Sequence, residues 1–75
     1  MLQAEVMGRV ASCKGNDTPE ARLSLADELY DKIYDDFRWG STVDLIDNGN
    51  GEYAIYLEDG DTQETYSITF KESEV

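Results

Sequence analysis

One stretch of this chain, Thr18 to Gly40, has the pattern of a long amphipathic helix that the remaining residues must cover. Thr18 is a good N-cap, because its hydroxyl can accept a hydrogen bond from an amide of the first turn. Pro19 suits the next position, where its fixed φ fits a helix and its missing N–H is no loss. Glu20 places negative charge at the positive end of the helix dipole. Gly40 stands where a left-handed C-terminal residue is expected.

The apolar residues of this stretch recur at helical spacing and fall within roughly 140° of arc at 100° per residue. They are Leu23, Ala26, Leu29, Tyr30, Ile33, Tyr34 and Phe37. We expect this face to be buried against the rest of the chain. Trp39 follows the stripe and is expected to close the edge of a small core, with an exposed binding anchor as the alternative.

Three segments after the helix alternate apolar and polar residues with a period of two, which predicts antiparallel strands. They are Thr42 to Asp47, Glu52 to Glu58 and Thr65 to Lys71. The residues expected to face the helix are Val43, Leu45, Tyr53, Ile55, Leu57, Tyr66, Ile68 and Phe70. The Gly-rich links that follow the first two segments suit tight hairpin turns.

Residues 2–12 fit either a strand or a helix. Their apolar positions are Leu2, Ala4, Val6 and Val10. We favour a strand because Gly8 costs a helix about 1 kcal/mol relative to Ala. The prediction is a single α+β domain over residues 1–75, with one long amphipathic helix packed on a three- or four-stranded antiparallel sheet. Residues 72–75 are expected to be frayed.

The charge balance narrows the possible partners. Seventeen acids face six bases, and the formal net charge is −11 with no His. This charge argues against direct binding of nucleic acid or an anionic membrane, because both are bound through Lys and Arg. It favours a basic protein partner. No apolar run reaches the ~20 residues of a membrane span, and the lone Cys13 fits a reducing compartment, so a cytoplasmic location is expected.

Acidic residues form a column on the predicted outer face of the helix. Asp27, Asp31 and Asp35 stand at i, i+4 and i+8, with Glu28 beside them. Successive members rise ~6 Å along the axis, near two axial phosphate steps of ~3.4 Å on one DNA strand. Such a row can occupy a groove built for a phosphate backbone. The alternative is an ordinary solvated face.

A second acidic region lies on the predicted outer face of the sheet, where no base occurs between Arg38 and Lys71. That face is expected to carry Asp44, Ile46, Glu52, Ala54, Tyr56 and Glu58. Tyr is enriched at interface hot spots, and surrounding acids suit a basic pocket. The candidate partner-binding residues are therefore Asp27, Glu28, Asp31, Asp35, Asp44, Ile46, Tyr56, Glu58, Asp59 and Asp61.

No catalytic motif is present, so we expect a protein that is not an enzyme and uses no cofactor or metal. Acid–base chemistry would need a carboxylate pair in a cleft, and Cys13 has Lys14 beside it but no base partner. The Asp47 to Glu52 segment has the first residue of an EF-hand loop but Glu52 where Gly is required. Turn chemistry explains this segment better than calcium binding.

The segment from Thr42 to Phe70, centred on Asp47-Asn48-Gly49-Asn50-Gly51-Glu52-Tyr53-Ala54-Ile55, follows a helix and resembles small acidic phage-encoded inhibitors. This class includes anti-CRISPR proteins and other DNA mimics. The resemblance implies an inhibitor that occupies the nucleic-acid site of a basic host protein, such as a Cas protein, in the cytoplasm of a bacterial host cell. The alternatives are a small structural or regulatory interaction module whose charge serves solubility, and a divalent-cation binder.

Overall fold

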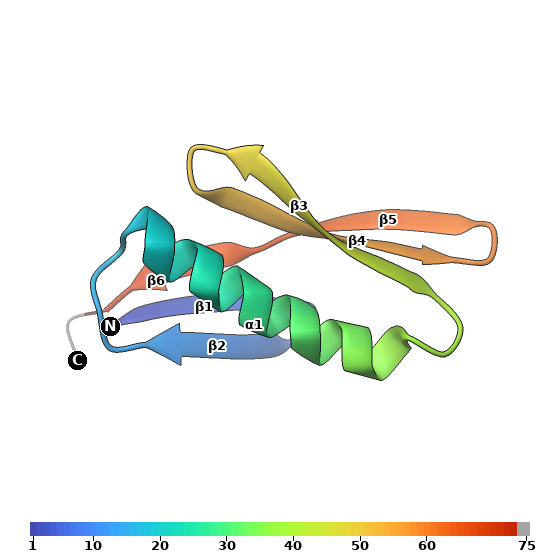
Figure 1. Ribbon diagram of the computed structural model, residues 1–75, viewed down its shortest axis with the longest axis horizontal. Coiled ribbons are helices and arrows are strands. Elements are labelled where there is room, and N and C mark those ends of the chain that lie inside the picture. Colours follow the sequence, from blue (N-terminus) through green and yellow to red (C-terminus); the bar gives the residue numbers. More distant parts are fainter. Residues whose placement is uncertain (74–75) are drawn as a thin grey trace.

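The computed structural model describes residues 1–73 as one helix and two three-stranded antiparallel sheets (Figure 1). The elements are β1 (Leu2–Val6), β2 (Arg9–Cys13), α1 (Pro19–Phe37), β3 (Thr42–Gly49), β4 (Glu52–Asp59), β5 (Thr62–Ser67) and β6 (Thr69–Glu72). Sheet A has the strand order β2-β1-β6 and sheet B the order β3-β4-β5. The α+β class is confirmed. The predicted long helix on one sheet is wrong, because the helix has 19 residues and the strands form two sheets.

The start of α1 follows the predicted capping chemistry, whereas its end does not. The Thr18 hydroxyl accepts a hydrogen bond from the Ala21 amide at 3.1 Å, and Pro19 occupies the first turn. At the other end Arg38 keeps right-handed helical angles, and Gly40 is not among the glycines with positive φ. The amide of Ser41 donates to the Phe37 carbonyl at 3.1 Å, so the chain leaves the helix without a left-handed residue.

The buried face of α1 is turned by roughly 60° from the predicted stripe, at 100° per residue. Its buried residues are Leu25, Ala26, Leu29 and Ile33. Leu25 lies outside the predicted stripe, whereas Leu23 and Tyr34, which belong to it, are each 46% exposed. The reason is that α1 packs against β1 and β2 as well as β3. Sheet A, which the sequence did not predict, sets the rotation of the helix.

Residues 2–12 form two strands joined by a tight turn, so the single predicted strand is wrong. Met7 and Gly8 have φ of 52° and 78°, the angles of a two-residue type I′ turn. The turn pairs Ala4 with Ala11, and both are buried. Val10 pairs with Glu5 on the opposite face and is 42% exposed. Because of the turn, Val10 lies on the exposed face of the sheet, whereas the alternation had placed it on the same face as Leu2, Ala4 and Val6.

The predicted strand from Thr65 to Lys71 is divided between the two sheets. β5 pairs with β4 in sheet B, and β6 pairs with β1 in sheet A. Ile68 lies at the crossing, where its amide still donates to the Tyr53 carbonyl at 2.9 Å. Beyond this point only Glu52 of β4 remains, because the strand begins there, and the chain continues along the free edge of β1. Apolar alternation continues through the crossing, which explains why it resembles one strand.

Sheet B otherwise follows its predicted alternation. Val43, Tyr53 and Ile55 are buried, and Leu45, Leu57 and Tyr66 are half-buried. Asn50 and Gly51 form the β3–β4 turn at positive φ. Ala54 is buried although solvent exposure was predicted for it. Its methyl group is shorter than the half-buried side chains of Ile46 and Tyr56 on the same face of the sheet.

The hydrophobic core lies where α1 crosses sheet A and runs along sheet B (Figure 1). It comprises Leu2, Ala4, Val6, Ala11, Leu25, Ala26, Leu29, Ile33, Val43, Tyr53, Ile55 and Ile68. The small side chains of Ala4, Ala11 and Ala26 fit a close approach between helix and sheet. Glu72 ends β6 and pairs with Leu2 rather than fraying. Residues 74 and 75 of the predicted frayed tail lie outside the described residues.

Candidate functional site

The outer face of α1 carries the predicted acidic column. Asp27, Asp31 and Asp35 are all exposed on the helix, which fixes their spacing. Asp35 lies 3.7 Å from Arg38. Within residues 1–73, Asp27 and Asp31 form no ion pair. These two carboxylates are therefore the members of the column that carry no ion pair.

The neighbouring acid on α1 is partly neutralised. Glu28 lies 3.5 Å from Lys32 across one helical turn, and both side chains are about half exposed. An exposed pair of this kind is worth only about 0.3–0.5 kcal/mol. A basic partner can therefore displace Lys32 from Glu28 at small cost.

Sheet B brings the second group of predicted residues together on one face. Asp44 and Tyr56 are directly paired on β3 and β4. The Tyr56 hydroxyl donates to the Glu58 carboxylate at 2.8 Å, and the Gln63 amide donates to the same oxygen at 3.2 Å. The hydrogen bond to Glu58, burial and the negative charges of Glu58 and Asp44 raise the pKa of Tyr56. This face therefore presents a neutral phenol held between carboxylates.

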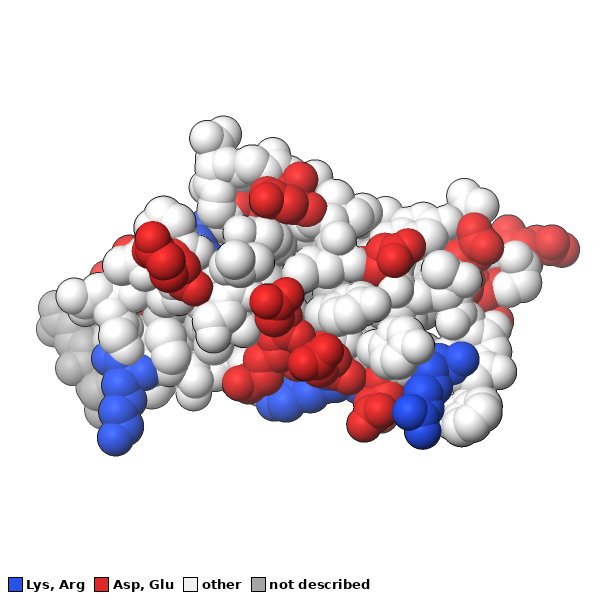
Figure 2. Space-filling view, viewed as in Figure 1, with Lys and Arg blue, Asp and Glu red and all other residues white. Residues whose placement is uncertain are grey.

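The remaining predicted residues flank this cluster. Ile46 is half-buried on β3. Asp59, the last residue of β4, and Asp61, in the β4–β5 turn, are both exposed. Figure 2 shows acidic side chains over the middle of α1 and toward the far end of the β4–β5 hairpin, with uncharged atoms and further acidic side chains between and beside them. The acids thus form two groups, one on the helix and one on sheet B, rather than one continuous row.

Trp39 is exposed, which overturns the expectation that it closes the core. Its side chain is 85% exposed just after the helix, and the Arg38 guanidinium carbon lies 4.9 Å from its ring centroid. Both residues border a shallow hollow of about 440 Å³. Glu58 and Gly60 from the β4–β5 hairpin also line this hollow. Trp39 is therefore available for contact beside the acidic group of sheet B.

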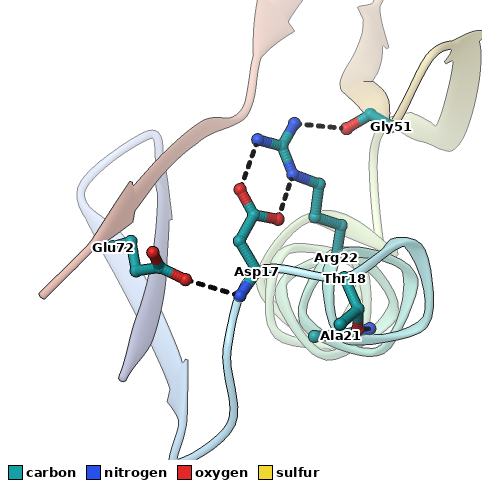
Figure 3. Close-up of polar contacts among 6 residues, drawn as sticks. All are labelled: Asp17, Thr18, Ala21, Arg22, Gly51 and Glu72. Atoms are coloured by element: carbon teal, nitrogen blue, oxygen red, sulfur yellow. Dashed lines mark hydrogen bonds and ion pairs between the residues drawn. The ribbon is translucent and has the colours of Figure 1, made fainter.

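Arg22 is a structural centre that the sequence reasoning missed (Figure 3). Its Nε and Nη2 atoms donate to the two carboxylate oxygens of Asp17 at 2.7 and 2.8 Å. Its Nη1 atom donates to the Gly51 carbonyl at 2.9 Å, and its guanidinium carbon lies 4.7 Å from the Phe70 ring centroid. The Glu72 carboxylate accepts from the Asp17 amide at 2.6 Å. Arg22 thus ties α1 to the β3–β4 turn and to β6.

The electrostatics of this centre are those of a structural clamp. Hydrogen bonding from Arg22, followed by its charge, lowers the pKa of Asp17 despite some desolvation, and the same pair raises the pKa of Arg22. An adjacent hollow of about 270 Å³ is lined by Arg22, Asn48, Glu52, Tyr53, Ser67, Ile68 and Phe70. The sequence did contain one signal, because at 100° per residue Arg22 falls within the apolar arc of the helix. A cationic side chain within the buried arc of a helix requires an acidic or hydrogen-bonding partner.

The calcium-like segment behaves as a turn. The Asp47 carboxylate accepts a hydrogen bond from the Gly49 amide at 2.8 Å, and a register irregularity separates these two residues. Across residues 1–73, no three or more His, Cys, Asp or Glu side chains are grouped so as to hold a metal ion. Cys13 is a half-buried free thiol. In the same part of the chain, α1 is too polar to cross a membrane.

Comparisons with known protein families, curated proteins and solved structures found no significant match to this chain.

Proposed function

We propose that this chain is a non-enzymatic acidic protein that binds a basic nucleic-acid-binding protein and inhibits it by occupying its nucleic-acid site. An anti-CRISPR protein acting on a Cas protein in the bacterial cytoplasm is the form that the resemblance suggests. The observation that carries the proposal is the exposed column on α1, in which Asp27 and Asp31 form no ion pair within the described residues.

The geometry of the column supports mimicry of a phosphate backbone. Carboxylates one turn apart rise ~6 Å along a helix, and phosphates of one DNA strand rise ~3.4 Å each. Asp27 and Asp31 can therefore meet cationic side chains arranged for alternate phosphates. A net charge of −11 also attracts a basic surface over a distance and speeds association at low salt.

Two aromatic side chains, one exposed and one half-buried, supply contacts that charge alone does not. Trp39 is 85% exposed, and Tyr56 lies among carboxylates with its hydroxyl bound to Glu58. Trp and Tyr are enriched among the residues that dominate binding energy at interfaces. They favour a specific contact with a protein over diffuse attraction to any cation.

Affinity capture from bacterial lysate tests the proposal. Immobilised chain should retain a nucleic-acid-binding protein at about 50 mM salt and release most of it by about 200 mM, because the contacts are ionic. Asp27→Lys with Asp31→Lys should abolish capture. Recovery of no basic protein at low salt would count heavily against the proposal.

A matched variant controls for overall charge. The double reversal on α1 changes the net charge from −11 to −7. Glu5→Lys with Ser12→Lys and Thr69→Lys makes the same change at exposed positions of sheet A. This control should retain most of the capture. Equal loss in both variants would show that net charge, rather than the α1 column, determines binding.

A protein-interaction module whose charge serves solubility is the second candidate. The exposed apolar side chains of Leu23, Tyr34 and Trp39 favour it, because they offer a surface that needs no carboxylates. Under this alternative, the double reversal on α1 leaves binding almost unchanged, whereas Trp39→Ala weakens it.

A further inference from the structure

The free hydrogen-bonding groups of β5 can be assigned from its pairing with β4. Asp59 and Thr62 flank a two-residue turn, so they form a hydrogen-bonded pair, and every second pair along an antiparallel ladder repeats this arrangement. The bond from the Ile68 amide to the Tyr53 carbonyl, at 2.9 Å, falls on the same alternation. The intervening residues direct their amide and carbonyl groups away from β4. They are Gln63, Thr65 and Ser67.

Side chains of α1 occupy the corresponding edges of β2 and β3. The same alternation directs the Val10 carbonyl outward from β2, where it accepts a hydrogen bond from Lys32 Nζ at 3.0 Å. It directs the Val43 carbonyl outward from β3, where it accepts from the Tyr30 hydroxyl at 3.3 Å. These two edges are therefore protected by the helix. β6 is the fourth edge strand. It has only four residues, and a short edge strand offers little to an added strand.

β5 lacks this protection. Within residues 1–73, no strand pairs with its outer side and no hydrogen bond reaches its outward backbone groups. Five of its six residues are exposed, and its register with β4 is continuous without a bulge. Its sequence, Thr62 to Ser67, contains no Lys and no Pro. Edge strands usually carry Lys, Pro or other charges that prevent pairing with another chain. The one charge on β5 is Glu64, which opposes an acidic strand but attracts a basic one, so this edge is open to an added basic strand.

The charge around β5 selects the kind of strand. Residues 42–67, which include all of sheet B, contain seven acids and no base. Glu64 lies on β5 itself, and Asp59 and Asp61 lie at and beside the adjoining turn. A second copy of this chain would bring two such surfaces together, and like charges oppose that contact. A segment bearing Lys or Arg would instead be attracted.

We propose that the open edge of β5 binds an extended, Lys- or Arg-bearing segment of the partner protein, which pairs antiparallel or parallel to it as a fourth strand of sheet B. This inference rests on the proposed function, because it takes the partner to be basic. Backbone hydrogen bonds from Gln63, Thr65 and Ser67 hold the segment, and alternate side chains confer specificity. The acidic column on α1 remains available for a second, ionic contact.

Two synthetic peptides separate strand addition from simple attraction. Lys-Val-Lys-Val-Lys-Val-Lys can form a strand. The Pro peptide, Lys-Pro-Pro-Lys-Pro-Pro-Lys-Pro-Pro-Lys, has the same number of Lys residues but places Pro on both alternations of any strand, so neither edge offers successive amide donors. The first should bind at least about tenfold more tightly at low salt, as expected when several net hydrogen bonds are gained. Its addition should protect the amides of Gln63, Thr65 and Ser67 from hydrogen exchange, measured by NMR.

Variants of the protein locate the contact. Thr65→Pro removes one outward donor and leaves the ladder to β4 intact, since Pro is tolerated where its nitrogen faces solvent. It should weaken binding of the Val peptide by about tenfold and leave the Pro peptide unaffected. Ser12→Pro, the matched change on the outer edge of β2, should leave both unaffected. Should Thr65→Pro fail to fold, the two peptides and amide protection on the unaltered chain still decide the matter.

The outcomes distinguish this inference from the proposed function. Equal affinities for the two peptides, without protection on β5, would overturn strand addition and leave acidic docking standing. Failure of the Val peptide to bind at low salt would also overturn strand addition, whereas the proposed function is decided separately by affinity capture from lysate. A dimer of the unaltered chain in sedimentation that Thr65→Pro converts to monomer would overturn the choice of a basic segment as the occupant.

Discussion

Replacement of Gly51 by Ala tests whether Arg22 holds the β3–β4 turn against α1. Gly51 has φ of +76°, and a Cβ added there would lie 3.1 Å from Arg22 Cδ. The positive φ alone costs a non-glycine residue about 1–2 kcal/mol. Arg22 cannot retreat freely, because Asp17 holds it at 2.7 and 2.8 Å on the opposite side. Moving it weakens the bond to the Gly51 carbonyl, and we expect a further loss of about 1 kcal/mol from this partly exposed contact.

Gly49→Ala provides the matched control. Gly49 has φ of +82°, so it bears the same backbone cost, but a Cβ there meets nothing within 4 Å. In urea denaturation, the free energy of unfolding should fall by about 1–2 kcal/mol for Gly49→Ala and by about 2–3 kcal/mol for Gly51→Ala. For a domain of this size, each kcal/mol corresponds to about 4–8 °C in melting temperature.

A double-mutant cycle isolates the role of Arg22. In an Arg22→Ala background, the Cβ at position 51 has no side chain to displace, so the two glycine substitutions should cost the same. The cycle should therefore give a coupling energy near 1 kcal/mol, typical of residues in contact. Equal losses for Gly49→Ala and Gly51→Ala in the unaltered chain would refute the reasoning and show that Arg22 does not hold the turn.

Three further predictions concern burial and charge. Leu29→Ala should lower the free energy of unfolding by about 2–5 kcal/mol, because Leu29 is fully buried. Leu23→Ala should lower it by less than about 1 kcal/mol, because Leu23 is 46% exposed. Similar losses for the two variants would contradict the rotation of α1. Trp39 fluorescence should be quenched efficiently by acrylamide in the folded chain, whereas protection would place the indole in the core. Arg22 holds the pKa of Asp17 below its ordinary value of 3.8, so the ionised carboxylate stabilises the fold above that value and this contribution is lost as pH falls through the lower folded pKa. The stability difference between the unaltered chain and Asp17→Asn should therefore shrink at acidic pH in urea denaturation, and a pH-independent difference would disprove the link.

Features determined by neighbouring residues were predictable from the sequence. The cap at Thr18 and the turn at Asn50 and Gly51 require only local backbone chemistry, and both are confirmed. The first hairpin was missed because Met7 adopts positive φ without the Asn or Asp that marks such turns. The crossing at Ile68 depends on where β4 ends, which alternation within the segment does not reveal.

The candidate site shows the same division between features that depend on neighbouring residues and features that depend on tertiary packing. Helical spacing was enough to predict the exposed column of Asp27, Asp31 and Asp35, because i and i+4 residues share a face. The exposure of Trp39 was not predicted, because the residue lies past the end of α1, where helical spacing no longer fixes the direction of the side chain. The proximity of Tyr56 and Glu58 follows from their positions two residues apart on one strand face, but their hydrogen bond required the structure.

Competition with nucleic acid is the most direct test of the proposed inhibition. A fluorescent DNA duplex bound to the captured basic protein should be displaced by this chain in proportion to its occupancy, and Asp27→Lys with Asp31→Lys should displace none of it. A ternary complex in which the protein holds DNA and this chain together would contradict occupation of the nucleic-acid site.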